Sequence, residues 1–329
     1  MAEVAIAQGP ILSAILEQTY SIWCEGLTPT AYERFYAAQL ATPWGRDHLR
    51  RFALVEGGEV LASAKEYIFD AVLAGQPIRV VGLGAVFTNR AHRGRSAARD
   101  LVERMLEDAA RDGADLALLF SEIGADYYAR LGFSPIDLRE TSLRVAESAR
   151  HGAPATLVRA GRDQDLAGIA AVGAVRADPF RFHLIRSRDL VHYSMAKKRL
   201  LAGLGPAGLR ELQFFVAEEG ASAVAYVVIS THRPARDGSS KWMLEECGDR
   251  DPSGARVGAI LQTLIARDPA EPRPEISAWL PPGFLPPQLT VVSERPSSEI
   301  MMIRALSEVA KNEMPIEADD VLYWHGDAF

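Results

Sequence analysis

Apolar residues in the first part of the chain follow helical spacing and then strand-like spacing. Residues 10–24 repeat isoleucine at helical intervals, and a second helical stretch covers 29–40. Two β-rich runs within 52–73 are joined by Glu56-Gly57-Gly58-Glu59, which predicts a hairpin. A further strand is expected over 78–88.

A long amphipathic helix and a buried strand follow. The helix is expected over 97–112, with Leu101 and Met105 on its apolar face. The apolar run at 115–120 reads as a buried strand. Three strands, a helix and a strand make an α+β core, and we place this first domain at 1–147.

The second domain, 148–329, repeats this order of elements. A polar stretch at 144–156 is interpreted as the linker. Residues 156–173 predict strand, turn and helix, 212–230 predict a hairpin, and 254–266 predict an amphipathic helix.

Two segments near the end of the sequence need separate interpretation. The proline-rich stretch 279–288 is expected to be a loop at a sheet edge rather than a ligand for a proline-binding module. Residues 319–329 are expected to form a strand with a short tail.

Composition and charge narrow the function classes. The chain has 329 residues, 48% of them hydrophobic, and a formal net charge of −7, so nucleic acid is a poor first partner. No apolar run approaches the ~20 residues that span a bilayer, and we expect no membrane partner. Cys24 and Cys247 match no metal spacing, which favours a reducing cytoplasm without disulfides and predicts no metal site.

The segment 86–98, Val-Phe-Thr-Asn-Arg-Ala-His-Arg-Gly-Arg-Ser-Ala-Ala, carries the candidate chemistry. A strand leads through a turn of small residues and three arginines into a helix. The first helical turn offers unpaired N–H groups and a positive dipole end to an anion, and Arg93 and Arg95 add charge-assisted donors. This pattern is typical of a pyrophosphate site, and a solvated basic turn with Ser96 as an ordinary N-cap is the alternative.

This loop resembles the Arg/Gln-x-x-Gly-x-Gly/Ala signature of the Gcn5-related N-acetyltransferase (GNAT) superfamily, from Arg93 to Ala98. Tyr128-Ala129-Arg130-Leu131-Gly132-Phe133 resembles the Tyr-x-x-x-Gly-Phe element of that family. The resemblance implies a mixed, mostly antiparallel sheet flanked by helices, and acetyl-CoA as co-substrate. Ser96 departs from the family at the central glycine. The cofactor-binding residues that it implies are Val86, Phe87, Thr88, Arg93, Gly94, Arg95, Ser96, Ala97 and Ala98.

A narrower resemblance links 85–106 and 118–133 to fungal lysine N-epsilon-acetyltransferases, whose second domain ends in a tryptophan-containing strand. Tyr323-Trp324 is placed to match that strand. Tandem-domain aminoglycoside acetyltransferases of the enhanced-intracellular-survival type are similar at the same level.

The second domain lacks the basic loop and the tyrosine element of the first. The helix starting at Gly254 has one arginine in its first six residues, and Arg250 in the preceding turn is flanked by Asp249 and Asp251. No Tyr-x-x-x-Gly-Phe follows. We therefore expect a degenerate GNAT-like domain that shapes the substrate cleft or a dimer interface, with a homodimer left open.

The resemblance also implies catalytic roles. Backbone N–H groups of 84–88 would polarise the thioester carbonyl, and Tyr128 would protonate the departing thiolate. Glu122 is the first candidate base, beside Asp126 and Glu66. The survival-type resemblance adds the terminal carboxylate, here on Phe329, and loss of the amine proton to water needs no base.

Two functions remain at this level. The first is an acetyl-CoA-dependent N-acetyltransferase that acetylates a small amine directly, with lysine or another cationic amine as acceptor. The second is a non-catalytic acyl-CoA-binding or regulatory protein in which Ser96 reflects lost turnover.

Overall fold

The computed structural model describes residues 2–146, 157–220, 222–233, 240–268 and 273–329. The chain divides into two compact units. Unit 1 comprises Met1–Asp137, Ser298–Ala318 and Phe329, and unit 2 comprises Leu138–Ser297 and Asp319–Ala328.

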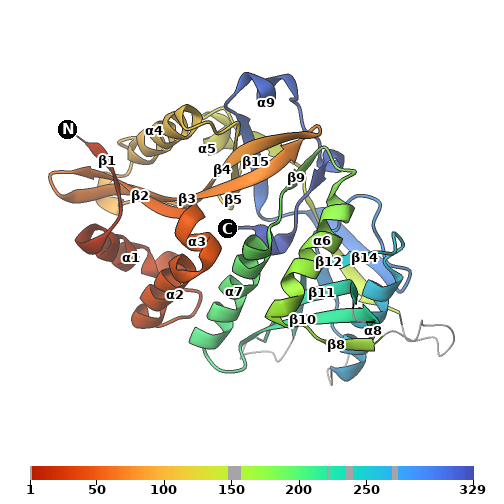
Figure 1. The fold of residues 1–329 in the computed structure, drawn as a ribbon. Coiled ribbons are helices and arrows are strands. Elements are labelled where there is room, and N and C mark those ends of the chain that lie inside the picture. Colours follow the sequence, from red (N-terminus) through yellow and green to blue (C-terminus); the bar gives the residue numbers. More distant parts are fainter. Residues whose placement is uncertain (1, 147–156, 221, 234–239, 269–272) are drawn as a thin grey trace. The chain divides into compact units, whose positions relative to one another are not determined.

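A mixed, mostly antiparallel sheet forms the centre of unit 1 (Figure 1). Its strands follow the order β1-β2-β3-β4-β5-β15-β6, and β4 and β5 are its parallel neighbours. The strands are β1 (Glu3–Ile6), β2 (Leu49–Glu56), β3 (Glu59–Leu73), β4 (Gln76–Thr88), β5 (Leu116–Ser121), β15 (Ile300–Ala305) and β6 (Ser134–Ile136). This sheet, with helices on both faces, confirms the predicted GNAT fold class.

Helices α1, α2 and α3 cover one face of this sheet, and α4 and α5 cover the other (Figure 1). Their bounds are α1 (Gly9–Trp23), α2 (Pro29–Ala41), α3 (Pro43–His48), α4 (Ala97–Arg111) and α5 (Asp126–Ala129); α9 (Glu308–Asn312) follows β15. Proline in the first turn of α1, α2 and α3 fits positions where the helix needs no backbone donor.

The core of unit 1 lies between α4 and the sheet. Leu101 and Met105 of α4 are buried at helical spacing, as predicted, and they belong to one cluster with Val81, Leu83 and Leu119. Because side chains alternate along a strand, even-numbered residues of β3 and odd-numbered residues of β4 and β5 face α4. The opposite face of each strand is left for α1–α3 and for the aromatic residues described below.

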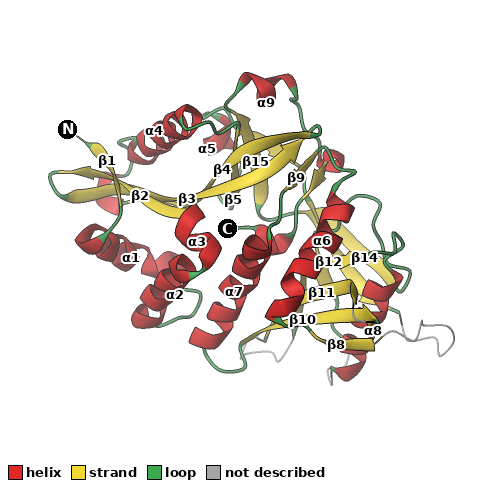
Figure 2. Cartoon of the chain, viewed as in Figure 1, coloured by secondary structure: helices red, strands yellow, loops and turns green. Residues whose placement is uncertain are grey.

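Unit 2 repeats this architecture around a second sheet (Figure 2). The strand order is β14-β7-β13-β12-β11-β10-β8. The strands are β14 (Leu289–Pro296), β7 (Arg139–Val145), β13 (Ile276–Ala278), β12 (Lys241–Asp249), β11 (Ser222–His232), β10 (Arg210–Glu219) and β8 (Leu157–Ala160). Buried residues of α6 (Leu166–Ala177) and α7 (Arg188–Leu204) pack on one face, and those of α8 (Ala255–Arg267) pack on the other.

The two units are not consecutive halves of the chain, as a boundary at residue 147 implies. We predicted a first domain that closes by residue 147, whereas β7 pairs with β13 and β14 in unit 2. Strand β15, from the far end of the chain, pairs with β5 and β6 and completes the sheet of unit 1. Strand β5 would otherwise present an unpaired edge, and pairing with β15 removes it.

Other outcomes concern single elements. The predicted linker begins inside β7, and its residues 147–156 lie outside the described residues. The stretch 279–288 is a loop, as expected. The strand expected in the final segment is short, β16 (Val321–Leu322), and pairs with β9 (Phe182–Leu184); a 3-10 turn at His325–Asp327 follows it. Helix α7 and strand β12 carried no prediction. Across the described ranges, none of the helices has the length and apolarity to cross a membrane.

Candidate functional site

The parallel strands β4 and β5 separate part-way along their length. They pair from Val80 opposite Leu116 to Leu83 opposite Leu119, and β4 then continues to Thr88 without a pairing to β5. Strand β3 still pairs with this stretch on its other side. Backbone N–H and C=O groups of 84–88 that face β5 are therefore available to an extended ligand.

A bulge marks the start of the separated stretch. Ala85 has φ +48°, in the left-handed region, and the β3–β4 register shifts between Ser63 and Lys65. A bulge turns the strand and re-aims its groups, and such irregularities are common beside binding sites. Of the strand residues predicted to contact the cofactor, Phe87 is buried, while Val86 and Thr88 are half-buried.

The loop after β4 is fixed at its first residue. The Asn89 carboxamide accepts from the backbone N–H of Ala91 at 3.1 Å and donates to the carbonyl of Val60 at 3.1 Å. The backbone N–H of Asn89 also donates to Leu61 at 2.9 Å. These bonds tie the loop to the β2–β3 hairpin and set the position at which the chain enters α4.

The first turn of α4 is open. Ser96 is its N-cap with φ +60°, and its hydroxyl caps no backbone N–H. The first bond to the cap runs from Asp100 N to Ser96 O at 2.9 Å, and within the described chain the N–H groups of Ala97, Ala98 and Arg99 donate to no protein acceptor. Three N–H groups and the positive end of the helix dipole therefore face outward together, as an anion requires.

Two arginines of the loop, Arg93 and Arg95, carry charges that no described acidic side chain pairs with. Arg93 and Arg95 are exposed, and among the described residues neither forms an ion pair. Gly94, between them, has φ +78°, and a Cβ there would meet no atom within 4 Å. Small residues and these two arginines therefore lie directly before the open turn, which itself contains Asp100. Ala97 and Ala98 point inward, into the core against the sheet.

The main chain at Tyr128 is held by the turn that follows α5. Its carbonyl accepts from Leu131 N at 2.9 Å and from Phe133 N at 3.1 Å. Gly132 has φ +78°, which explains why glycine occupies this position of the Tyr-x-x-x-Gly-Phe element. The Phe133 ring lies edge-on to the Tyr128 ring at 6.0 Å. The backbone at Tyr128 is thus held by these bonds, and its ring is buried against Phe133.

Burial and the neighbouring Tyr127 raise the pKa of Tyr128 to about 12. The phenol therefore stays protonated over the ordinary pH range and can donate its proton. Its hydroxyl forms no hydrogen bond with another described residue. Tyr127 lies edge-on at 4.9 Å and is half-buried, and burial also raises its pKa.

The candidate bases differ in their surroundings. Glu122 and Asp126 are exposed at the end of β5 and the start of α5. Glu66 is buried, and burial raises the pKa of its carboxyl. On β3 it shares a face with Ala64 and Ile68, which pack toward α4.

Phe329 lies against β4, on the face opposite to Glu66. Its ring is 4.4 Å from that of Tyr67 and 5.6 Å from that of Phe120. A Cβ at Gly82 would lie 2.6 Å from Cζ of Phe329, and one at Gly84 would lie 3.1 Å from its Cδ2 and 3.6 Å from its main-chain O. The structure therefore brings Phe329, as well as the α4 loop, to the point where β4 and β5 separate.

Gly82 and Gly84 were not singled out from the sequence. Their role is steric, because the Phe329 ring occupies the space that side chains would fill. The alternation Gly82-Leu83-Gly84 within a buried strand is the signal that could have shown a close approach on one face. Tyr67, Phe69 and Trp44 complete the aromatic group, with Trp44 stacked on Phe69 at 5.2 Å.

Helix α8 of unit 2 starts as α4 does but is closed. Gly254 is its N-cap with φ +70°. The Asp249 carboxylate accepts from Arg256 N at 2.9 Å and Val257 N at 3.4 Å, and it pairs with the Arg256 guanidinium at 3.2 Å. Arg256 also contacts Glu219 at 2.9 Å through Nε. A buried carboxylate of this chain thus stands where an anionic ligand would bind.

In the ranges that the structure describes, no group of three or more His, Cys, Asp and Glu residues is placed to hold an ion.

Comparison with known proteins agrees with this geometry. Residues 16–136 match the family described as acetyltransferase (GNAT) domain. A sequence comparison with curated proteins finds no significant match.

Solved structures of similar fold cover nearly the whole chain. A GCN5-related N-acetyltransferase from Anabaena variabilis superposes with a TM-score of 0.70 at 11% identity, over 93% of this chain and 73% of that one. One from Kribbella flavida gives 0.65 at 18% identity, over 93% and 71%. Eis1 from Mycobacterium abscessus gives 0.57 at 17% identity, over 95% and 76%. At these identities the likeness concerns the fold. The family match shows that residues 16–136, most of unit 1, are similar to acetyltransferase (GNAT) domains, and the solved structures share the fold.

Proposed function

We propose that the protein is an acetyl-CoA-dependent N-acetyltransferase that acetylates a small cationic amine, such as lysine, by direct transfer. The observation that supports this most strongly is the open first turn of α4 beside the separation of β4 from β5. An anion site and an unpaired strand edge lie next to each other, which suits a ligand with a phosphate end and an extended amide arm.

Each part of the site then has a task. Arg93, Arg95 and the N–H groups of 97–99 would hold the pyrophosphate, and the β5-facing groups of 84–88 would pair with the pantetheine amides. Acetyl-CoA would supply the activated thioester. A backbone N–H near the Ala85 bulge would hydrogen-bond the thioester carbonyl oxygen and stabilise the negative charge that develops there.

The amine nitrogen attacks the carbonyl carbon, the C–N bond forms, and the C–S bond breaks. Tyr128 would give its phenolic proton to the departing thiolate, since its raised pKa keeps that proton available. The amine must lose a proton. Glu122, Phe329 through its main-chain oxygen beside Gly84, and solvent water are the routes that we propose to test.

A cationic acceptor is supported by the surroundings of Phe329. The half-buried ring of Phe120 lies at the end of β5, close to the point of strand separation. Aromatic faces attract ammonium groups, and the chain carries a net charge of −7. The resemblance of 85–106 and 118–133 to fungal lysine acetyltransferases points to the same class of acceptor.

An amine panel tests this proposal. Purified protein is incubated with acetyl-CoA and lysine, a polyamine, an aminoglycoside or an uncharged aryl amine, and products are identified by mass spectrometry while free thiol is followed. The proposal predicts one or more acetylated cationic amines and equimolar thiol release. Acetyl-CoA binding without any acetylated amine would favour a non-catalytic acyl-CoA-binding protein instead.

The cytoplasm is the compartment that we propose. Cys24 and Cys247 are free thiols, as is usual in a reducing environment, and acetyl-CoA is a metabolite of that compartment.

A further inference from the structure

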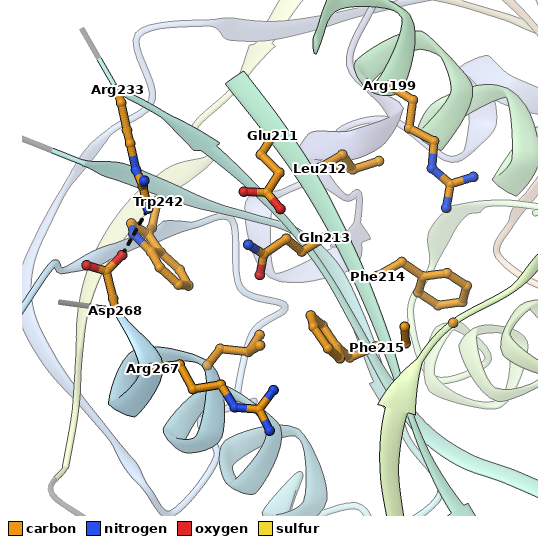
Figure 3. Close-up of a pocket in the computed structure, with 13 residues that line it drawn as sticks. Arg199, Glu211, Leu212, Gln213, Phe214, Phe215, Arg233, Trp242, Arg267 and Asp268 are labelled. Atoms are coloured by element: carbon orange, nitrogen blue, oxygen red, sulfur yellow. Dashed lines mark hydrogen bonds and ion pairs between the residues drawn. The ribbon is translucent and has the colours of Figure 1, made fainter. Parts of the chain in front are cut away.

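We infer that unit 2 carries a second ligand site, a pocket of about 470 Å³ that fits a small aromatic carboxylate. The pocket lies where the C-terminal end of α8 meets β10 and β12 (Figure 3). All of its lining residues belong to unit 2, and none belongs to the acetyl-transfer machinery. The volume falls within the range of small-molecule pockets.

Part of the pocket lining is a stretch of β10 that no described strand pairs with on the β8 side. Strand β8 pairs with β10 from Phe215 to Glu218, and Gly161 N adds one bond to Phe214 O. Residues 211–213 extend beyond that pairing. In Figure 3 the side chains of Gln213 and Phe215 extend from β10 toward α8, whereas Phe214 extends to the other side. The wall on the α8 side therefore combines polar and aromatic groups.

Three donors on this wall are without partners. The Trp242 side chain is buried, yet its Nε1–H donates to no described residue. Arg267, the last residue of α8, forms no ion pair within the described ranges, and the Gln213 amide forms no hydrogen bond there. A buried indole N–H that stays unpaired costs free energy, so a bound acceptor would stabilise the protein here.

The charges of the pocket favour an anion. Among the described residues Arg267 forms no ion pair, whereas Arg233 pairs with Asp268 at 3.5 Å and Arg199 pairs with Asp163, also at 3.5 Å. Glu211, an exposed lining residue, is the acid that opposes it and has no ion pair with a described residue. A guanidinium matches the two oxygens of a carboxylate in one plane.

The apolar part of the pocket favours an aromatic ligand. Phe215, Leu264 and the indole of Trp242 line it, and these surfaces suit a flat ring better than a sugar or a polyamine. The ring would pack between Phe215 and Trp242, with the carboxylate toward Arg267 and Gln213. This juxtaposition of an unpaired guanidinium with two aromatic walls is the basis of the inference.

Three probes of one shape test it. Hydrocinnamate, its amide and phenylpropylamine are titrated into the full chain by calorimetry. The anion should bind, with the neutral amide and the ammonium at least about tenfold weaker. Equal affinity for anion and amide, stronger binding of the ammonium through Glu211, or no binding of the anion at millimolar concentration would overturn the inference.

Variants locate the binding. Arg267→Gln should weaken hydrocinnamate about tenfold, because the charged donor is lost from an exposed position that does not affect folding. Arg295→Gln, on an equally exposed arginine of β14 that pairs with Glu140 at 2.7 Å, is the matched control and should bind as the wild type does. Trp242→Phe should weaken binding and also abolish the ligand-induced change in tryptophan fluorescence. Unchanged affinity in Arg267→Gln would refute the site.

Discussion

The Asp249 carboxylate accepts the backbone N–H of Arg256 at 2.9 Å and so occupies the first turn of α8 from within the chain. In unit 1, no described carboxylate accepts from the first N–H groups of the matching turn of α4, after Ser96. Both helices begin after a residue in the left-handed region. They differ in the source of the negative charge at the first turn. In α8 the protein supplies it, and in α4 we propose that the ligand does.

Loss of this cap should destabilise unit 2. Asp249→Ala leaves the backbone N–H groups of Arg256 and Val257 without their acceptor. It also removes the Asp249 carboxylate from its ion pair with the Arg256 guanidinium. We expect the free energy of unfolding to fall by about 1–2 kcal/mol, the range for a lost N-cap. Urea denaturation measures this. Asp47→Ala, at an exposed surface pair with Arg46, should change stability little, and an equal effect of both variants would contradict the capping role.

Tyr128→Phe should lower kcat and leave the KM for acetyl-CoA nearly unchanged. The ring and its packing on Phe133 survive, while the donated proton is lost. General acids contribute about 10²–10⁴-fold, so a loss in that range is expected in steady-state assays with an acceptor from the panel. Tyr127→Phe is the matched control and should be close to neutral. A loss in Tyr127→Phe alone would move the acid by one residue.

The Tyr128 hydroxyl also determines how activity should depend on pH. Because the pKa of Tyr128 is raised to about 12, its proton is present across the stable pH range. Activity should therefore rise as the acceptor amine loses its proton and show no descending limb from this group below about pH 11. A descending limb near pH 9 that disappears in Tyr128→Phe would contradict the assignment.

Gly82→Ala tests the contact between β4 and Phe329. The new Cβ would lie 2.6 Å from Cζ of Phe329 and 2.9 Å from the Phe69 ring, so the aromatic group must shift. Overpacking of this kind costs about 1–3 kcal/mol. Thermal or urea denaturation measures the loss, and Phe329→Ala combined with Gly82→Ala should recover part of it. Additive losses in the double variant would show that the two positions do not interact.

The buried carboxyl of Glu66 should make the stability of the protein depend on pH. Burial raises its pKa in the folded state, so the folded protein favours the protonated carboxyl. The resulting stability is present below the unfolded pKa, about 4.3, and is lost as pH rises through the raised folded value. Glu66→Gln should therefore stabilise the protein at about pH 8 relative to the wild type and give no gain at about pH 4. Acetyl transfer should persist in this variant, and its loss would make Glu66 the base.

The sequence was informative where a motif is local. The apolar pattern predicted the β4 strand and α4, and the resemblance to the GNAT family pointed to the arginine-containing loop and the Tyr128 element, all within about 55 residues. Turn chemistry at Glu56-Gly57-Gly58-Glu59 likewise predicted the hairpin correctly. Short-range patterns of this kind are set by backbone geometry and burial on one face.

Long-range pairing could not be found in the same way. The apolar sequence of the short strand β15 would suit many positions in a buried sheet. Nothing in this sequence indicates that β15 pairs with β5, which lies far earlier in the chain. The same holds for β7, which lies next to unit 1 in sequence but pairs in unit 2. The contact of Phe329 with Gly82 and Gly84 depends on this tertiary arrangement. A single sequence does not show which distant residues come together in this way.

The central claim is that unit 1 binds acetyl-CoA at the open turn of α4 and that unit 2 does not bind it. Calorimetric titration of the full chain with acetyl-CoA measures both affinity and stoichiometry. The account predicts one molecule per chain, with affinity reduced at least about tenfold in the Arg93→Ala/Arg95→Ala variant, because two charge-assisted contacts are lost. Two equivalent sites in the wild type, or wild-type affinity in the double variant, would contradict it.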